Sequence, residues 1–290
     1  MKSTKAIMFT LWTAGIMLCV LVSIIALLFS ACAKTEEEPK KGDMPFNVES
    51  EQPGGPTDPP EDPNTQEPNT TDEPEPSAPV SPTRLGETPD AGREYLNKIT
   101  FLGDSTTYGI GAYYNLGYTD LCPPSQIWTP ASGTLTLSWY DIATIVYPET
   151  KEEISIVEAA TRGKPEILMI TLGVNGISFM DESEFIEAYT NLVHNVQAAS
   201  PDTKIILNSI YPVATNYEHL SQINNEKIRA ANGWVERIAE NTGCRFLNSF
   251  EAVVGEDGNL PLSSQNGDGL HLTGETFGTV MNYIRTHAYQ

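Results

Sequence analysis

One serine in the first half of the chain and one Asp/His pair near its end have the residue types of a nucleophilic triad. Ser105 follows Gly103 and Asp104, and Asp268 precedes His271 by three residues. A serine hydroxyl is a poor nucleophile until a base accepts its proton, and histidine, with a pKa of about 6.5, is the usual base. An aspartate at this spacing can place its carboxylate on Nδ1 of the histidine and so fix the tautomer. We therefore predict Ser105 as nucleophile, His271 as general base and then acid, and Asp268 as the orienting carboxylate.

Each of these motifs alone also has a purely structural interpretation. Gly-Asp-Ser can be an ordinary turn, and Asp268 with His271 can be a polar turn that caps the last helix. The other histidines, His194, His219 and His287, have no carboxylate at comparable spacing. The pairing of the two motifs in one chain therefore favours the catalytic interpretation and His271 as the base.

The order of the apolar runs predicts a scaffold that can bring these residues together. An apolar, β-favouring run ends on Gly103, and residues 166–172, which contain a continuous apolar run over residues 167–170, end at Gly173. A continuous apolar run of strand length is typical of a parallel strand covered on both faces. Because ligands of open α/β sheets bind outside the carboxyl ends of the strands, both motifs are expected at that edge.

Strands and helices are expected to alternate along the rest of the domain. The expected strands are residues 95–103, 126–128, 166–172, 204–210 and 245–247. The expected helices are residues 105–114, 152–160, 181–200, 219–241 and 273–287, with His194 on the outer surface. Such alternation predicts an α/β fold with a parallel sheet between two layers of helices.

Three short blocks in this order resemble the SGNH/GDSL hydrolase family. They are Gly-Asp-Ser at residues 103–105, Gly-Val-Asn-Gly at residues 173–176 and Asp-Gly-Leu-His at residues 268–271. The resemblance covers almost all of residues 98–290. It implies a three-layer αβα flavodoxin-like domain and a serine esterase or acylhydrolase that needs no cofactor. It also implies that the N–H of Ser105 is one donor of an oxyanion hole.

Two further donors follow from the resemblance, together with two departures from the family pattern. The side-chain amide of Asn175 is expected to donate to the oxyanion, and so is the N–H of a glycine in the second block. Gly133 is the candidate for that glycine, with Gly111 and Gly117 as competitors. The family has an aspartate after the asparagine, whereas this sequence has Gly176. These departures keep a second interpretation open, a non-catalytic surface module that binds glycans on the same fold.

Charge and composition exclude several other functions. The net charge is −21, and residues 91–290 contain 23 acidic and 11 basic residues, which gives −12. Nucleic-acid binding needs clustered Lys and Arg, so nucleic acid is not an expected partner. No Cys/His cluster has zinc-like spacing, and no metal is expected. Cys122 and Cys244 could form a disulfide, although Cys244 also fits a small buried residue at the start of a strand.

The N-terminal third of the sequence predicts export and a spacer. Residues 6–33 carry no charge and follow Lys2 and Lys5, so residues 1–33 are expected to be a signal peptide or a membrane anchor. The end of this run resembles a lipobox, which implies lipidation of Cys32 on the outer face of the bacterial plasma membrane. A single-pass anchor is the alternative. Residues 34–90 contain 13 of the 21 prolines and 15 acidic residues, so a disordered linker is expected before a hydrolase domain over residues 91–290.

Together these features predict an extracellular, membrane-tethered serine esterase. Its location suggests a substrate that carries an acyl or acetyl ester, either a small molecule or a cell-envelope or other extracellular glycan. Hydrolysis and acyl transfer to a sugar use the same triad, so the sequence leaves both open.

Overall fold

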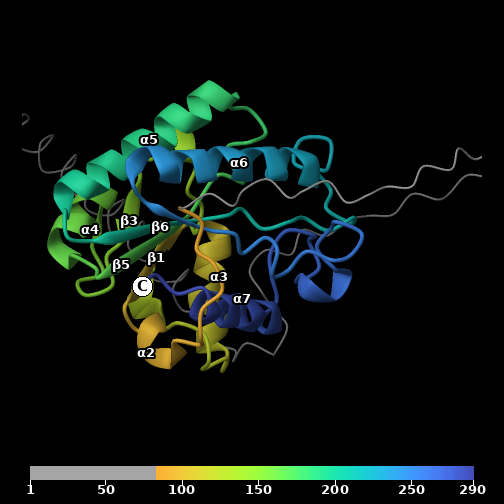
Figure 1. Ribbon diagram of the computed structural model, residues 1–290, viewed down its shortest axis with the longest axis horizontal. Coiled ribbons are helices and arrows are strands. Elements are labelled where there is room, and N and C mark those ends of the chain that lie inside the picture. Colours follow the sequence, from red (N-terminus) through yellow and green to blue (C-terminus); the bar gives the residue numbers. More distant parts are fainter. Residues whose placement is uncertain (1–82) are drawn as a thin grey trace, which may run out of the picture. The chain divides into compact units, whose positions relative to one another are not determined.

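A five-stranded parallel sheet organises the part of the chain that the structure, a computed structural model, describes, residues 83–290 (Figure 1). The strand order is β2, β1, β5, β6, β7, and every neighbouring pair is parallel. The strands are β1 (Ile99–Gly103), β2 (Ile127–Trp128), β5 (Ile167–Thr171), β6 (Lys204–Asn208) and β7 (Arg245–Leu247). The central strand β5 is buried along its whole length, as its continuous apolar run predicts.

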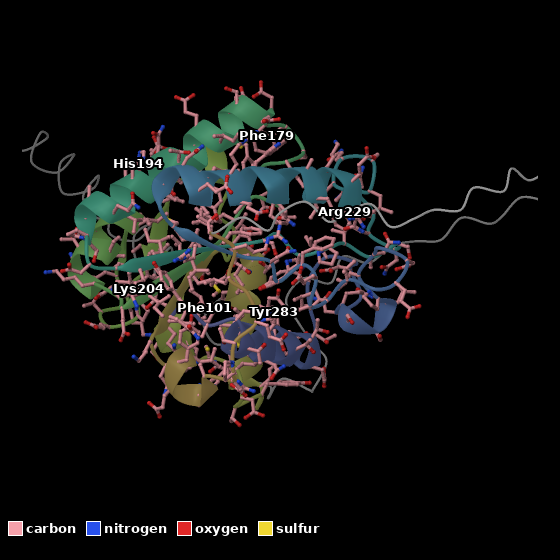
Figure 2. The ribbon with its side chains drawn as sticks, viewed as in Figure 1. Phe101, Phe179, His194, Lys204, Arg229 and Tyr283 are labelled. Atoms are coloured by element: carbon pink, nitrogen blue, oxygen red, sulfur yellow. The ribbon has the colours of Figure 1, made fainter. Side chains whose placement is uncertain are left out.

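Helices cover both faces of this sheet, so the predicted α/β fold class is confirmed (Figure 1). One layer contains α2 (Gly92–Leu96), α3 (Ser105–Asn115) and α7 (Gly274–Thr286). The other contains α4 (Ile156–Gly163), α5 (Glu182–Ala199) and α6 (Asn225–Thr242). His194 lies on the outer surface of α5, as expected (Figure 2).

Local capping decides where the helices begin. Asp181 and Glu184 form the capping box at the start of α5 that their spacing predicts. The helix expected from residue 219 begins only at Asn225, because the side chain of Asn224 accepts the N–H of Lys227. The first strand is also shorter than expected, since residues 95 and 96 belong to α2.

A small antiparallel hairpin replaces part of an expected helix. It consists of β3 (Thr144–Val146) and β4 (Glu153–Ser155), which together form a separate two-stranded sheet. The helix predicted over residues 152–160 therefore starts at Ile156. Ser155 is its N-cap and accepts the N–H of Glu158.

The ordered contacts of the domain begin before the expected boundary at residue 91. The N–H of Leu85 donates to Phe246 O at 2.8 Å, and the N–H of Phe246 donates to Thr83 O at 3.0 Å. Arg84 also pairs with Glu236. The last eight residues of the predicted linker therefore include a short extension of the sheet beside β7, because that edge strand still offers unpaired backbone groups.

Several predictions fall on residues 1–82, which lie outside the described part of the chain. These are the signal peptide or anchor, the lipidation of Cys32 and most of the linker. Within residues 83–290, no helix is both long and apolar enough to cross a bilayer. The two cysteines in this range, Cys122 and Cys244, are free thiols and buried, so the possible disulfide is not formed.

Candidate active site

Ser105 is the first residue of α3 and follows β1 after a single residue. The residue between them, Asp104, is the N-cap of the helix, and its side chain accepts the N–H of Thr106 at 3.0 Å. Gly103 has no room for a side chain, because a Cβ would lie 2.0 Å from Thr107 Oγ1 and 2.6 Å from Thr171 O. The close approach of helix and sheet at Gly103 places Ser105 at the carboxyl end of β1.

Ser105, His271 and Asp268 lie in one hydrogen-bonded row. His271 Nε2 lies 2.8 Å from Ser105 Oγ, although 166 positions separate the two residues in the sequence. His271 Nδ1 lies 2.6 Å from Asp268 Oδ2. If Nδ1 carries the ring proton and donates to Asp268, Nε2 is an acceptor for the hydroxyl of Ser105. The fold therefore brings together the three predicted catalytic residues in the predicted order.

The carboxylate of Asp268 also organises the loop that carries the histidine. Its Oδ1 accepts the N–H of Leu270 at 2.8 Å and the N–H of His271 at 2.9 Å. Burial acts to raise the pKa of Asp268, but the hydrogen bonds from the side chain and backbone of His271 outweigh it and lower the pKa. Asp268 is therefore ionised at neutral pH and can stabilise an imidazolium.

A neighbouring loop holds this segment in place, a role that the motifs alone do not indicate. The N–H of Ala214 donates to Gly269 O at 2.8 Å, and Asn216 Nδ2 donates to Gly267 O at 3.3 Å. Gly269 has a positive φ of 80°, and a Cβ there would lie 2.6 Å from the backbone of Tyr217. The glycines on either side of Asp268 are the sequence signal for this left-handed turn and close approach.

Asn175, the predicted oxyanion donor, lies just beyond the end of β5 and is half-buried. Its Nδ2 donates to Leu135 O at 3.3 Å. A side-chain amide has two N–H groups, so this contact leaves one hydrogen for a ligand. Gly173, at the start of the same turn, has a φ of 129°, and a Cβ there would lie 2.8 Å from Ile210 and Phe185.

The structure does not present Gly133 as a free donor. Its N–H donates to Pro130 O at 2.8 Å within a tight turn. Of the two competing glycines, Gly111 is inside helix α3, and the N–H of Gly117 donates to Tyr114 O at 3.0 Å. The predicted role of Gly133 therefore requires the turn over residues 130–133 to open.

Gly176 occupies a position with little space for the aspartate of the family pattern. Its N–H donates to Gly173 O at 2.8 Å. A Cβ at residue 176 would lie 3.0 Å from Met180 Sδ and 3.3 Å from Gly173 O. The turn after β5 is thus closed by backbone contacts, without a carboxylate.

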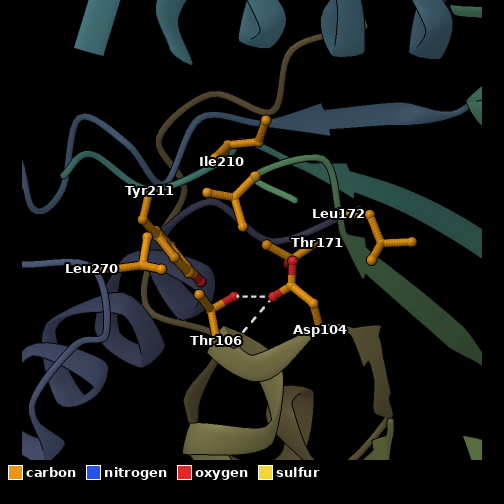
Figure 3. Close-up of a pocket in the computed structure, with 8 residues that line it drawn as sticks. Asp104, Thr106, Thr171, Leu172, Ile210, Tyr211 and Leu270 are labelled. Carbon is orange, nitrogen blue, oxygen red and sulfur yellow. Dashed lines mark hydrogen bonds between the residues drawn. The ribbon is translucent and has the colours of Figure 1, made fainter. Parts of the chain in front are cut away.

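Asp104, which the sequence indicates only as part of the Gly-Asp-Ser motif, is a buried acid next to Ser105. It is 1% exposed and lies beside Thr171, Tyr211 and Leu270 around a cavity of about 10 Å³ (Figure 3). Burial raises the pKa of Asp104 to about 6, against hydrogen bonds from Thr106 and the nearby charge of His271 that act to lower it.

The raised pKa of Asp104 predicts a gain in stability for Asp104→Asn. Between about pH 4 and pH 6 the unfolded chain releases this proton while the folded protein retains it, so the wild type loses stability as the pH rises. The neutral variant lacks this loss and can still accept the N–H of Thr106. We expect its advantage in unfolding free energy to grow by up to about 3 kcal/mol over that range. Urea unfolding at several pH values tests this, with the exposed Asp141→Asn as control. A difference that does not change with pH would contradict the expectation.

The αβα fold and the row of Ser105, His271 and Asp268 define the class of the protein, a serine ester hydrolase. Residues 101–276 match the GDSL-like Lipase/Acylhydrolase family, and this match covers more than half of the chain. The chain therefore belongs to that family, whose members hydrolyse esters.

Several solved structures are similar to this chain at low sequence identity. A GDSL-like lipase from Bacteroides thetaiotaomicron VPI-5482 is 19% identical, with 64% of this chain and 85% of that chain covered and a TM-score of 0.45. The periplasmic domain of a lipopolysaccharide acetyltransferase from Salmonella ser. Paratyphi A is 18% identical, with 70% and 84% covered and a TM-score of 0.44. A search of the curated proteins gives no match.

Proposed function

We propose that the protein is an exported serine esterase that removes an acyl or acetyl group from an extracellular or cell-envelope glycan. The observation that carries this proposal is the row of contacts from Ser105 Oγ through His271 to Asp268, at 2.8 and 2.6 Å. The first distance is within the range that a nucleophile and its base require, and the second is within the range for a base and its orienting carboxylate.

The reaction follows from these contacts. Ser105 Oγ attacks the ester carbonyl carbon while His271 Nε2 takes the hydroxyl proton, and Asp268 stabilises the resulting imidazolium. The oxyanion accepts hydrogen bonds from the N–H of Ser105 and from Asn175 Nδ2. Collapse of this intermediate breaks the bond to the alcohol oxygen, which receives the proton from His271. A water molecule then repeats the sequence on the acyl-enzyme and releases the acid.

The location in this proposal comes from the N-terminal sequence. The uncharged residues 6–33 after Lys2 and Lys5 support export, and Cys32 supports a lipid anchor on the outer face of the plasma membrane. A flexible linker of this length would hold the domain about 40 Å from the membrane on average. Labelling of cells with a palmitate analogue tests the anchor: a label that Cys32→Ala removes supports lipidation, and an unlabelled membrane-bound protein supports the single-pass alternative.

A fluorophosphonate probe tests the catalytic part of the proposal. The probe should label Ser105 in the folded protein. The base that activates this hydroxyl for attack on an ester carbonyl carbon also activates it for attack on the phosphorus atom of the probe. Mass spectrometry of the modified peptide locates the label, and His271→Ala should greatly slow the labelling. Folded wild-type protein that stays unlabelled, binds a glycan and hydrolyses no ester would instead support the non-catalytic glycan-binding module.

A further inference from the structure

A groove of about 330 Å³ lies along α3, the helix that begins with Ser105. On the helix side it is lined by Tyr108, Ala112 and Asn115, and on the opposite side by Thr129, Pro130 and Lys151. Its volume is within the range of about 300–1,000 Å³ that is usual for small-molecule sites. The triad uses none of these six residues.

The groove begins at Tyr108, about one helical turn along α3 from the reacting serine. Ser105, Tyr108 and Ala112 are spaced by three and four residues, so they follow one another along the same side of the helix. Tyr108 also packs against the turn of the predicted oxyanion glycine, since a Cβ at Gly133 would lie 3.5 Å from Tyr108 Cγ. Pro130, on the opposite wall, accepts the N–H of Gly133. A substrate held in the groove therefore extends away from the ester bond along α3.

The charge of the groove is opposite to that of the domain. Residues 91–290 contain 23 acidic and 11 basic residues, but the groove has no acidic lining residue and one lysine. Within residues 83–290, none of the salt bridges involves Lys151. Its backbone is left-handed, with a φ of 64°, and its N–H donates to Tyr147 O at 2.8 Å in the turn between β3 and β4. This turn holds the backbone of Lys151 at the edge of the groove, and the exposed ammonium group of Lys151 has no carboxylate partner within salt-bridge distance among the described residues.

The remaining lining side chains suit a polar ring compound. Tyr108 is 36% exposed and offers an aromatic face together with a hydroxyl. Asn115 offers an amide and Thr129 a hydroxyl, so donors and acceptors are available on both walls. We propose that the groove binds the alcohol part of the ester, and that this part is a saccharide with a carboxylate group. The sugar ring packs on Tyr108 and the carboxylate pairs with Lys151. This inference rests on the proposed esterase function and names its substrate class.

Binding to Ser105→Ala protein tests the inference without turnover. Two probes are titrated by calorimetry: an O-acetylated trimer of galacturonate and the same trimer after its carboxyl groups are reduced to alcohols. We expect the uronate to bind roughly two- to fivefold more tightly, as one solvent-exposed ion pair allows. Lys151→Gln in the same background should remove this difference.

Lys164→Gln is the matched control, because Lys164 is also exposed and left-handed, with a φ of 40°, but lies outside the groove. It should preserve the preference for the uronate. Tyr108→Ala should weaken both probes together. Equal affinity of the two probes, no binding of either, or equal effects of the two lysine variants would overturn the inference. Fluorophosphonate labelling of Ser105 is independent of these results, so the substrate class and the esterase function can fail separately.

Discussion

Ser105→Ala is expected to lower kcat for the hydrolysis of an aryl acetate by roughly 10⁴- to 10⁶-fold. The reason is that Ser105 Oγ is the oxygen that faces the imidazole, at 2.8 Å from His271 Nε2, and alanine has no atom that can attack the carbonyl carbon. The residual rate comes from binding and from the oxyanion donors, which the substitution leaves in place. Initial rates at saturating substrate, measured with highly purified variant, give the ratio.

The fold should tolerate this change. Ser105 is 9% exposed, and alanine is the smaller residue. The start of α3 depends on Asp104, whose side chain accepts the N–H of Thr106, so the N-cap remains. Ser263→Ala is the control, because it removes an exposed hydroxyl that is not part of the row formed by Ser105, His271 and Asp268. It should leave kcat unchanged. A folded Ser105→Ala protein with more than a few per cent of the wild-type rate would rule out Ser105 as the nucleophile.

The central strand and the positions of the motifs could be predicted from the sequence because local patterns encode them. Residues 167–170 are apolar without alternation, as a strand covered on both faces requires, and the chain turns at the glycine that follows shortly after. The order of the motifs predicts that Ser105 and His271 approach each other. The sequence does not predict the distance of 2.8 Å between Ser105 Oγ and His271 Nε2, because this distance depends on the packing of α3 and α7 against one face of the sheet.

Features that depend on distant contacts could not be predicted. The short strands β3 and β4 pair only with each other and have no long apolar run. The burial of Asp104 depends on surrounding residues from other parts of the chain, and the support of Gly269 by Ala214 joins two loops far apart in the sequence. Local composition does not indicate which residues are the partners in these contacts.

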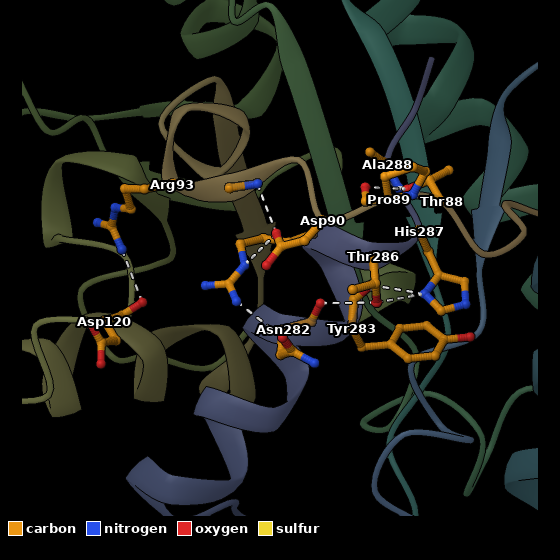
Figure 4. A network of polar contacts seen from close by, with 12 residues as sticks. Thr88, Pro89, Asp90, Arg93, Asp120, Asn282, Tyr283, Thr286, His287 and Ala288 are labelled. Atoms are coloured by element: carbon orange, nitrogen blue, oxygen red, sulfur yellow. Dashed lines mark hydrogen bonds and ion pairs between the residues drawn. The ribbon is translucent and has the colours of Figure 1, made fainter.

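The start of the domain shows the same limit. Composition assigns residues 83–90 to the acidic, proline-rich linker, but several of them bind to the folded domain. Asp90 Oδ1 accepts Arg285 Nε at 3.0 Å, and Thr88 Oγ1 accepts the N–H of Ala288 at 3.2 Å (Figure 4). Polar composition therefore predicts exposure for this segment, but not the partners that order it.

Asp268→Asn is expected to lower kcat by roughly 10³- to 10⁴-fold while the fold persists. Asn Oδ1 can still accept the N–H groups of Leu270 and His271, so the loop keeps both backbone contacts. Its amide nitrogen, however, replaces Oδ2 and presents two hydrogens to His271 Nδ1. The ring must then accept at Nδ1 and carry its proton on Nε2. That proton points at Ser105, so the histidine can no longer act as its base.

The comparison with Asp257→Asn separates this tautomer effect from a general loss of charge. Asp257 is exposed and also accepts a backbone N–H within its own loop, from Asn259 at 3.1 Å, but it is not part of the row at Ser105. The same backbone bond is the main cause of its lowered pKa. We expect its asparagine variant to keep the wild-type kcat.

The pH dependence of stability gives a second, independent readout of Asp268. Its folded-state pKa is lowered, so the ionised carboxylate stabilises the fold at neutral pH, and this contribution disappears as the pH falls below about 4. The asparagine variant should therefore unfold more easily than the wild type at pH 7 and equally easily at low pH. Unchanged kcat in Asp268→Asn, beside an inactive Ser105→Ala, would mean that another group orients the imidazole and that the contact at 2.6 Å only stabilises the loop.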